Sequence, residues 1–483
     1  MKKGLFARKT IGSLLKEASD TKHGLKRTLG PLNLTAIGIG AIIGAGLFVL
    51  TGEAAANAAG PAVVLSFIVA AISCFFAALC YAEFAALIPI AGSAYTYAYA
   101  TMGEFVAWII GWGLSLEFLF SVATVASGWS GYLASLLKDF GITLPAAIAS
   151  APIAHNVQTG WVGTEGLINL PAIVIIALLG ILVARGVQMA AFLNNILVLV
   201  KLGIIVLFVA CTVAYVKTDN WVPFIPPNTG TFGEFGFSGI LRGAGIVFFA
   251  FLGFDAVATM SQEAKNPQKD IPIGMLGSLS VSTVVYVIFS LLLTGIVSYK
   301  ALGVSDPVAV AVDALGPSFV WLRYVAKLAI LAAFTSVILI MMMGQARIFY
   351  TMAHDGLIPK AFGKIHSSFR TPFFATVMVA LIAMVMSGFL PVGLLGTLTS
   401  MGALLAFALV CLGILVLRFT QPTLHRPFKT PWMPWVPLLG TVFTVAQMIA
   451  LPAVTWMQFI IWMVIGCFIY YYYGRHHSKV RNG

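Results

Sequence analysis

Lys201 lies near the centre of an apolar run that extends from Ile196 to Cys211, and its neighbours along the chain provide no opposite charge. A charge at the centre of a lipid bilayer costs roughly 2.5–3.5 kcal/mol, so an ionisable residue at that depth marks a functional site by default. Burial away from water favours the neutral form of an amine, which lets a lysine release a proton near neutral pH. The alternative is a structural lysine, but snorkelling to the surface is unfavourable from the middle of a span. Lys201 is therefore the best candidate for a group that carries or senses a proton.

Two carboxyl groups at membrane depth are further candidates. Glu117, in the third apolar span, could be a proton co-carrier, the counter-ion of a basic substrate or a structural partner of another helix. Asp255 follows Gly253 in the sixth span and could act near a site or cap a helix. All seven histidines lie outside the apolar spans or at their ends, which excludes the usual proton carrier. The sequence indicates no metal ion and no cofactor.

These side chains must be positioned by membrane-spanning helices. The chain of 483 residues is 60% hydrophobic and only 9% charged, which excludes a water-soluble globular protein. A helix needs about 20 apolar residues to cross a bilayer. Such stretches predict an all-α membrane protein with twelve transmembrane helices, at 33–57, 62–88, 104–135, 167–184, 189–216, 239–261, 275–298, 321–352, 373–390, 393–418, 434–453 and 456–473. The stretch 321–352 is too long for one simple crossing, so its ends should project from the bilayer.

The basic residues predict the orientation. Twelve spans place both termini on one side, which then holds 21 of the 28 Lys and Arg residues, against six on the opposite side. By the positive-inside rule both termini are cytoplasmic. The net charge of +12 therefore belongs to one membrane face and does not indicate a nucleic-acid partner. All five cysteines fall within spans, so we expect no structural disulfide and no disulfide-linked subunit.

The first and sixth spans are each predicted to be broken at mid-membrane. The first has four glycines within 38–46, and the sixth reads Phe249-Ala250-Phe251-Leu252-Gly253 at the corresponding place. If spans 1–5 and 6–10 are inverted repeats, each broken helix opens its repeat, a pattern that indicates a midplane binding site. Unwound backbone offers N–H groups to a carboxylate and carbonyls to an ammonium group, the two charged ends of an amino acid. Close packing of helices is the alternative explanation of the glycines.

Several motifs are spread in order over nearly the whole chain. They are the glycine-rich run 38–48, Tyr81-Ala82-Glu83, the run 92–97, Phe251-Leu252-Gly253-Phe254-Asp255, the run 347–359 and His425-Arg426-Pro427-Phe428. Together they resemble the amino acid–polyamine–organocation (APC) superfamily of transporters, and the branch looks like the bacterial relatives of the cationic amino acid transporters. The resemblance implies a LeuT-like fold of five plus five helices in an inverted repeat, two more C-terminal helices, and alternating access around one amino acid.

The resemblance also implies the division of the chain. Residues 1–31 should form an amphipathic cytoplasmic segment, 32–218 the first repeat and 219–420 the second repeat. Residues 421–474 should hold the last two helices, and 475–483 a cytoplasmic tail.

The substrate site implied by the resemblance lies at the two helix breaks and at one position of the eighth span: Ile42, Ile43, Gly44, Ala45, Gly46, Phe249, Ala250, Phe251, Leu252 and Met341. Amides of residues 44–46 should bind the substrate carboxylate, and carbonyls of residues 42, 249, 250 and 252 should bind its ammonium group. Either Phe249 or Phe251 should cover the substrate side chain as a gate.

The resemblance gives Lys201 a specific place. In sodium-coupled relatives of this fold, a sodium ion ties the first helix to the eighth, and similar proton-coupled members place a fifth-helix lysine there. Lys201 matches that lysine. Its expected partners are the carbonyl of Gly40 and a hydroxyl from Thr335 or Ser336.

The sequence therefore predicts a proton-coupled amino acid symporter that imports by alternating access in a bacterial-type plasma membrane, and not an enzyme. The apolar eighth-span wall with Met341 favours small neutral amino acids such as alanine, with broad selectivity, whereas the branch resemblance favours arginine or lysine. An exchanger of the same fold and an amino acid-binding sensor or channel are the alternatives. The expected partners are an amino acid, a proton and membrane lipids, and a small membrane partner is left open.

Overall fold

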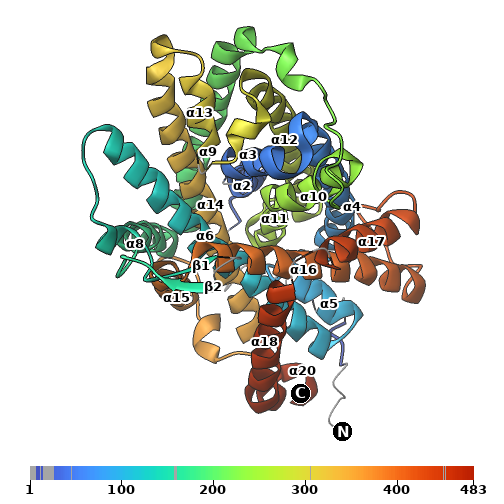
Figure 1. The fold of residues 1–483 in the computed structure, drawn as a ribbon. Helices are drawn as coiled ribbons and strands as arrows, with labels where there is room; N and C mark the ends of the chain where they lie inside the picture. The colour runs from blue at the N-terminus through green and yellow to red at the C-terminus, as the bar shows by residue number, and fades with distance from the viewer. Residues whose placement is uncertain are drawn as a thin grey trace.

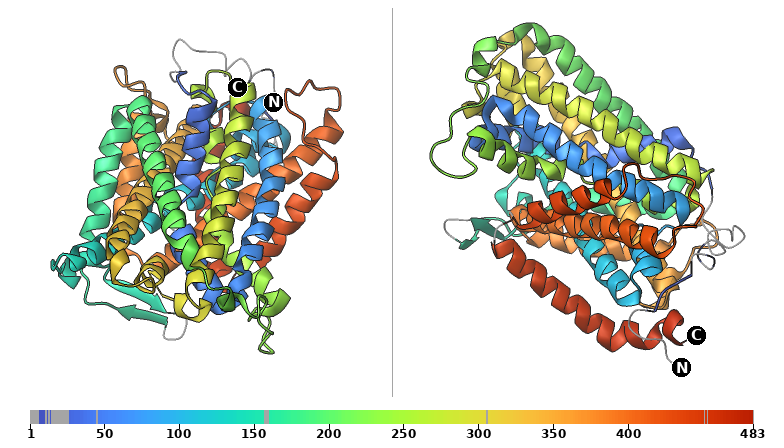
Figure 2. Two further views of the ribbon diagram at one scale, coloured as in Figure 1. Left: turned by 90° about the horizontal axis from the view of Figure 1, so that it is seen from above. Right: turned by 90° about the vertical axis from the view of Figure 1, so that its right-hand side faces the viewer.

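The computed structural model (Figure 1) describes residues 7–10, 12, 14, 27–44, 46–156, 160–304, 306–449, 451 and 453–482. Helices dominate it, and they run side by side between two ends where the connections gather (Figure 2). The main helices are α2 Pro31–Ile42, α4 Val63–Leu87, α5 Ala94–Thr101, α6 Glu104–Asp139, α8 Leu170–Arg185, α9 Val187–Thr212, α10 Gly236–Phe248, α12 Pro267–Ile296, α13 Pro307–Asp313, α14 Val320–His354, α15 Phe373–Phe389, α16 Val392–Thr420, α17 Trp435–Ile449 and α18 Ala453–Ile469.

A small hairpin is an exception to the all-α prediction. Strand β1 Ile153–Asn156 pairs antiparallel with β2 Gly160–Gly163, in the long connection between α6 and α8. The short helix α7 Ala146–Ala149 precedes it. The connection therefore has secondary structure of its own, which the sequence analysis did not predict.

Eight helical stretches of the described chain are long and apolar enough to cross a membrane, and four shorter helices are apolar as well. Helices α6 and α14 have 36 and 35 residues. At a rise of 1.5 Å per residue each is about 50 Å long, well above the hydrocarbon thickness of about 30 Å. The 321–352 stretch thus forms one long helix, as its length required, and the projection of its ends from the bilayer stays a prediction.

Two helices are interrupted near the middle of the bundle. Helix α2 ends at Ile42, and the chain resumes helical structure at Gly46 in the π-helical turn η1 Gly46–Leu50, followed by α3 Thr51–Ala54 and η2 Ala55–Ala59. Helix α10 ends at Phe248, continues as the 3₁₀ turn η6 Phe249–Phe251 and becomes helical again in α11 Ala256–Thr259. Gly253 has a φ of 112°, a left-handed conformation that a residue with a side chain rarely adopts.

The two interruptions lie against each other. A Cβ atom added to Gly46 would lie 2.2 Å from the Cα atom of Ala250, so only glycine allows this approach of the two backbones. Helix α2 also packs against α9, α12 and α14 (Figure 1), and α14 packs against α6. The bundle therefore surrounds both breaks with helices, which keeps unwound backbone away from lipid.

Both ends of the described chain meet at one end of the bundle. Asp355, just after α14, forms an ion pair with Lys9 and accepts a hydrogen bond from the Tyr95 hydroxyl at 2.7 Å. Its carbonyl accepts from the amide of Lys479 at 3.0 Å, in the short C-terminal helix α20 Lys479–Asn482. Most of the predicted N-terminal segment 1–31 lies outside the described residues.

Candidate functional site

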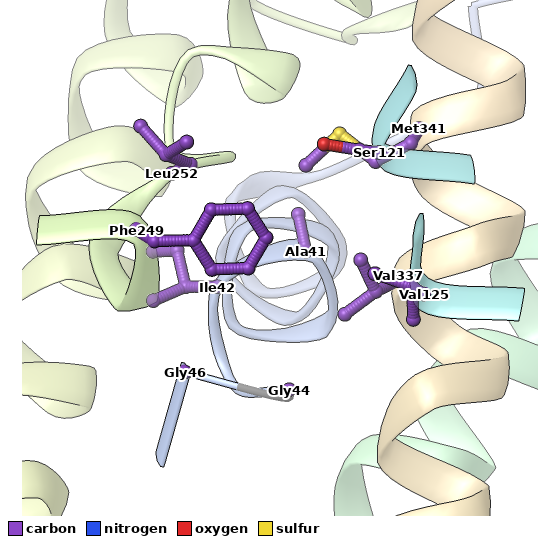
Figure 3. A pocket seen from close by; sticks show the side chains of 10 residues that line it. All are labelled: Ala41, Ile42, Gly44, Gly46, Ser121, Val125, Phe249, Leu252, Val337 and Met341. Atoms are coloured by element: carbon purple, nitrogen blue, oxygen red, sulfur yellow. The ribbon is translucent and has the colours of Figure 1, made fainter. Parts of the chain in front are cut away.

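A small cavity lies at the two helix breaks (Figure 3). Its volume of about 20 Å³ is enough for roughly one water molecule. The lining residues come from α2, η1, α6, the sixth-span break and α14: Ala41, Ile42, Gly44, Gly46, Ser121, Val125, Phe249, Leu252, Val337 and Met341. None of these side chains is charged, and apart from the Ser121 hydroxyl they are apolar.

The first break contributes backbone to this cavity. Gly44 and Gly46 both line it, and within the described residues the amide of Gly44 donates no hydrogen bond. Ile43 does not line the cavity, and its carbonyl accepts a hydrogen bond from Lys201. Ala45 lies outside the described residues. Of the three residues predicted to bind the substrate carboxylate, Gly44 and Gly46 line the cavity.

The sixth-span break contributes Phe249 and Leu252, and Figure 3 shows the Phe249 ring projecting across the cavity. Phe251 instead is fully buried and packs against Tyr286, with ring centroids 5.1 Å apart. Ala250 lies behind the cavity against Gly46. Of the two phenylalanines considered as a gate, Phe249 is the one that reaches the cavity.

Tyr286 of α12 was not among the predicted site residues. Its hydroxyl lies 2.8 Å from the carbonyl oxygen of Ile42 and 2.7 Å from that of Ala250, so it bridges the two breaks. A hydroxyl has one proton, so it donates to one of these carbonyls at a time. The sequence predicts both carbonyls as partners of the substrate ammonium group. In the structure they instead lie within hydrogen-bond distance of the Tyr286 hydroxyl. The only sequence signal was a tyrosine in an apolar span, since a buried hydroxyl needs a partner.

Lys201 is fully buried and its ammonium group lies at the end of α2. The Nζ atom donates to the carbonyls of Ile39 at 2.9 Å, Gly40 at 3.2 Å and Ile43 at 2.9 Å. It also lies 3.0 Å from Ser336 Oγ on α14. The last carbonyls of a helix have no partner within the helix and carry the negative end of its dipole, so they favour a cation.

The two hydroxyls considered for Lys201 have different surroundings. Ser336 contacts the ammonium group and donates to the carbonyl of Gly40 or Ala333, at 2.9 and 2.7 Å. Thr335 instead accepts a hydrogen bond from Trp129 Nε1 at 3.1 Å. Neighbouring residues of a helix point about 100° apart, which separates them.

Glu117 and Asp255 are both fully buried, and the structure brings them together as electrostatic neighbours. Neither carboxyl group has a hydrogen-bond partner within the described residues. Glu117 lies one helical turn before Ser121, which lines the cavity, but neither acid lines the cavity itself. The pair is therefore adjacent to the predicted site and outside its wall.

The chain is similar to known transport proteins over nearly its whole length. The family described as amino acid permease matches residues 29–473. A methylthioribose transporter of Bacillus subtilis (strain 168) is 42% identical over 474 residues, covering 98% of each chain. The branched-chain amino acid permease BcaP of the same strain is 42% identical over 481 residues, covering 99% of this chain and all of the relative. Cationic amino acid transporter 4 of Mus musculus is 34% identical over 430 residues, 86% of this chain and 64% of the relative.

Proposed function

Because this chain belongs to the amino acid permease family of the APC superfamily, we propose that it is a proton-coupled symporter that imports neutral amino acids by alternating access. The observation that carries the coupling is the Lys201 ammonium group bound to three carbonyls at the break of the first helix. The observation that supports a neutral substrate is the uncharged wall of the cavity.

The proposal includes the architecture that the family implies. Twelve spans form an inverted repeat of 32–218 and 219–420, followed by two helices within 421–474, and both termini face the cytoplasm of a bacterial cell. The interruptions of α2 and α10 at equivalent places support the repeat. Asp355 forms an ion pair with Lys9 and accepts a backbone hydrogen bond from Lys479. These contacts support an arrangement with both ends on one side.

Protonated Lys201 ties the inner half of the first helix to α14. The three carbonyls and Ser336 surround the ammonium group, which has three protons to donate. A neutral amine has only two protons, and its lone pair would face carbonyl oxygens. Loss of the Lys201 proton therefore weakens the hydrogen bonds that hold α2 against α14. Helix α2 can then move, which opens the site toward the cytoplasm.

The substrate occupies the cavity between the two breaks. Its carboxylate binds the amides of Gly44 and Gly46, and its ammonium group binds the carbonyls at Phe249 and Leu252, next to those held by Tyr286. Since the cavity of about 20 Å³ is smaller than any amino acid, substrate entry requires Phe249 to move aside. Phe249 thus acts as the gate.

The apolar wall selects the side chain of the substrate. Val125, Val337 and Met341 accept small neutral side chains such as that of alanine, with broad selectivity. The similarity to branched-chain amino acid permeases extends this range to valine, leucine and isoleucine. Burying an uncompensated charge against these groups would cost several kcal/mol, which disfavours a basic substrate unless a carboxylate compensates its charge.

The acidic pair has two roles to distinguish. Two ionised carboxylates side by side in a membrane interior repel each other, so Glu117 and Asp255 can share a proton and act as co-carriers. Alternatively Glu117, one turn from Ser121, is the counter-ion of a basic substrate, as the similarity to cationic amino acid transporters favours. Selective loss of arginine uptake in Glu117→Gln would establish the second role.

Ser336 and Thr335 form a matched pair for testing the Lys201 site. Ser336→Ala removes a hydroxyl that contacts the ammonium group, and we expect it to reduce pH-gradient-driven uptake about 10-fold, the effect of one charged hydrogen bond. Thr335→Val removes the neighbouring hydroxyl, which bonds Trp129, and should leave coupling unchanged. The measurement is initial uptake of alanine into proteoliposomes with and without a pH gradient. Equal loss in the two variants would contradict the assignment.

Met341 tests the selectivity of the wall. Met341→Ser adds space and a hydroxyl to the cavity, so longer and basic amino acids should begin to compete with alanine, with a gain of about 10-fold in apparent affinity. Met343→Ser is the control, because Met343 does not line the cavity. Competition by all common amino acids against labelled alanine measures the effect. Preference of the wild type for arginine or lysine would contradict a neutral substrate.

A further inference from the structure

A second cavity lies at the end of the bundle where the two chain ends meet. Its volume is about 320 Å³, much larger than that at the helix breaks. It is formed where α8 turns into α9 and where the connection before α15 approaches. The lining residues are Thr28, Arg185, Gly186, Val187, Gln188, Met189, Ser368, Phe369 and Arg370. Two arginines and no acidic residue line it, so the cavity carries a positive charge.

Neither arginine is neutralised in the described part of the chain. Arg185 and Arg370 are both exposed and take part in no ion pair among the described residues. Arg370 has a φ of 55°, a backbone conformation that is uncommon for a residue with a long side chain. The loop that holds it is fixed to α8, because the Thr371 hydroxyl donates to the carbonyl of Ala184 at 2.8 Å.

Further hydrogen-bond donors face the same cavity. Helix α9 has 26 residues and begins at Val187 without a side-chain cap. The amide of Ala190 donates to the carbonyl of Gly186, whereas the amides of residues 187–189 have no acceptor within the described chain. Such an uncapped helix start attracts anions. The Thr28 hydroxyl is buried and has no hydrogen-bond partner among the described residues. Two guanidinium groups, free amides and a hydroxyl suit the oxygens of a phosphate group.

The surroundings of the cavity indicate where the phosphate comes from. Met189 and Phe369 on its lining, and Phe192 and Phe373 beside it, are exposed by 54%, 41%, 66% and 39%. Exposed apolar side chains continue from there along α8, at Leu178 and Ile181. This surface suits the acyl chains of a lipid. A cavity that is basic on one side and apolar on the other is typical of a site for anionic lipid head groups.

We infer that the cavity between α8, α9 and the connection before α15 binds the phosphate head group of an anionic phospholipid of the inner leaflet. The inference rests on the proposed orientation, in which this end of the bundle faces the cytoplasm. Arg185 and Arg370 bind the phosphate oxygens, the first turn of α9 donates its amides, and the acyl chains lie on the exposed face of α8 and α9. Because α9 also carries Lys201, the bound lipid supports the helix that positions the coupling lysine.

The test measures lipid retention, which does not require transport. Purified protein is equilibrated in detergent micelles with phosphatidylglycerol, with phosphatidylcholine, or with inorganic phosphate, and bound lipid is counted by native mass spectrometry. The wild type should retain phosphatidylglycerol over phosphatidylcholine. The double variant Arg185→Gln and Arg370→Gln should lose that retention about 10-fold or more, since each basic residue adds to attraction at the membrane surface.

The matched control is Lys360→Gln with Lys364→Gln, which removes the same charge from the same connection at positions that do not line the cavity. It should retain phosphatidylglycerol like the wild type. Equal loss in both double variants would show unspecific attraction and overturn the inference. Binding of inorganic phosphate to the wild type without any preference for phosphatidylglycerol would also overturn it, in favour of a site for a soluble anion. Failure of coupled transport would leave the lipid result unaffected, so the two proposals fail independently.

Discussion

Lys201→Ala will lower pH-gradient-driven amino acid accumulation by about 100-fold or more. The variant removes an ammonium group that donates to three carbonyls and contacts Ser336, and each charged hydrogen bond contributes roughly 1.5–3 kcal/mol. Lys201→Arg should fail as well, because a guanidinium group does not release its proton at physiological pH and its planar shape does not fit four converging oxygens. Uptake into proteoliposomes under an imposed pH gradient measures both variants.

A second buried lysine provides the control. Lys327 is also buried, but its Nζ atom pairs with Asp139 at 2.5 Å near the opposite end of α14 from Asp355. Lys327→Arg keeps that ion pair and should retain coupled uptake. Exchange of internal for external substrate should persist in Lys201→Ala if the variant is folded. Wild-type accumulation in either Lys201 variant would remove this residue from the mechanism.

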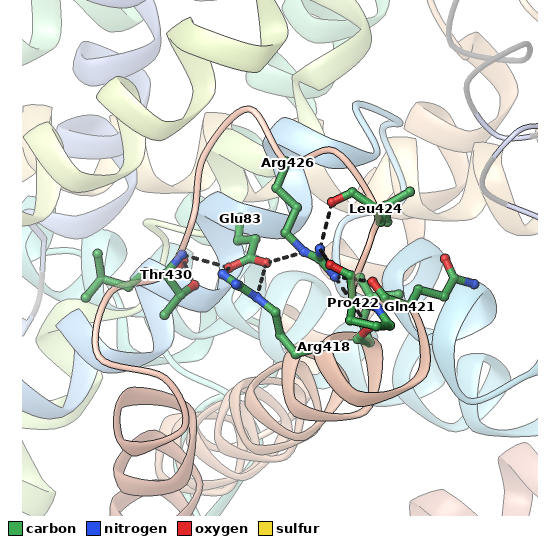
Figure 4. A network of polar contacts seen from close by, with 9 residues as sticks. Glu83, Arg418, Gln421, Pro422, Leu424, Arg426 and Thr430 are labelled. Carbon is green, nitrogen blue, oxygen red and sulfur yellow. Dashed lines mark hydrogen bonds and ion pairs between the residues drawn. The ribbon is translucent and has the colours of Figure 1, made fainter.

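Glu83→Gln will destabilise the fold by about 3–5 kcal/mol, the usual effect of breaking a buried ion pair. Figure 4 shows the fully buried Glu83 carboxylate between two arginines. It accepts from Arg418 Nε at 2.9 Å and Nη2 at 2.8 Å, and from the amide of Thr430 at 2.7 Å. Arg426 Nε lies 3.0 Å away. These contacts join α4, the end of α16 and the connection to α17, so the neutral amide would leave two guanidinium groups uncompensated.

The effect of Glu83→Gln is measured as the loss of monodisperse protein on heating in detergent. Glu53→Gln is the control, because Glu53 is exposed and has no ion pair within the described residues, and it should melt like the wild type. Adding Arg426→Gln to Glu83→Gln should recover part of the stability, since it removes one of the two guanidinium groups left without a carboxylate. Unchanged melting of Glu83→Gln would contradict a structural role for this network.

The features recognised from the sequence are those that depend only on residues close together along the chain. Lys201 stands out as the single charge in an apolar run, and the glycines of 38–46 mark a backbone break, so both required no knowledge of neighbouring helices. The family resemblance is confirmed by the match over residues 29–473. The division into repeats and the roles of the site residues stay predictions.

The features that sequence reasoning left open or missed depend on how helices are rotated and crossed. Ser336 and Thr335 are adjacent in sequence, and only the packing of α14 on α2 and α6 decides which one reaches Lys201. Tyr286 reaches the breaks from α12, 36 residues beyond Ala250, and no periodic pattern reveals that contact. Ser121, Val125 and Val337 line the cavity for the same reason. The hairpin β1–β2 was missed because its strands have only four residues each and show no alternation of apolar and polar residues.

The most direct test of the proposed function is uphill accumulation of alanine by purified protein in proteoliposomes that contain no internal amino acid. With the interior more alkaline than the exterior, labelled alanine should accumulate above its external concentration, and a protonophore should abolish the accumulation. The Lys201→Ala protein, reconstituted in parallel, should only approach equilibrium. Accumulation that requires internal amino acid and ignores the pH gradient would establish an exchanger, and the absence of any uptake despite alanine binding would establish a sensor; either result contradicts proton-coupled symport.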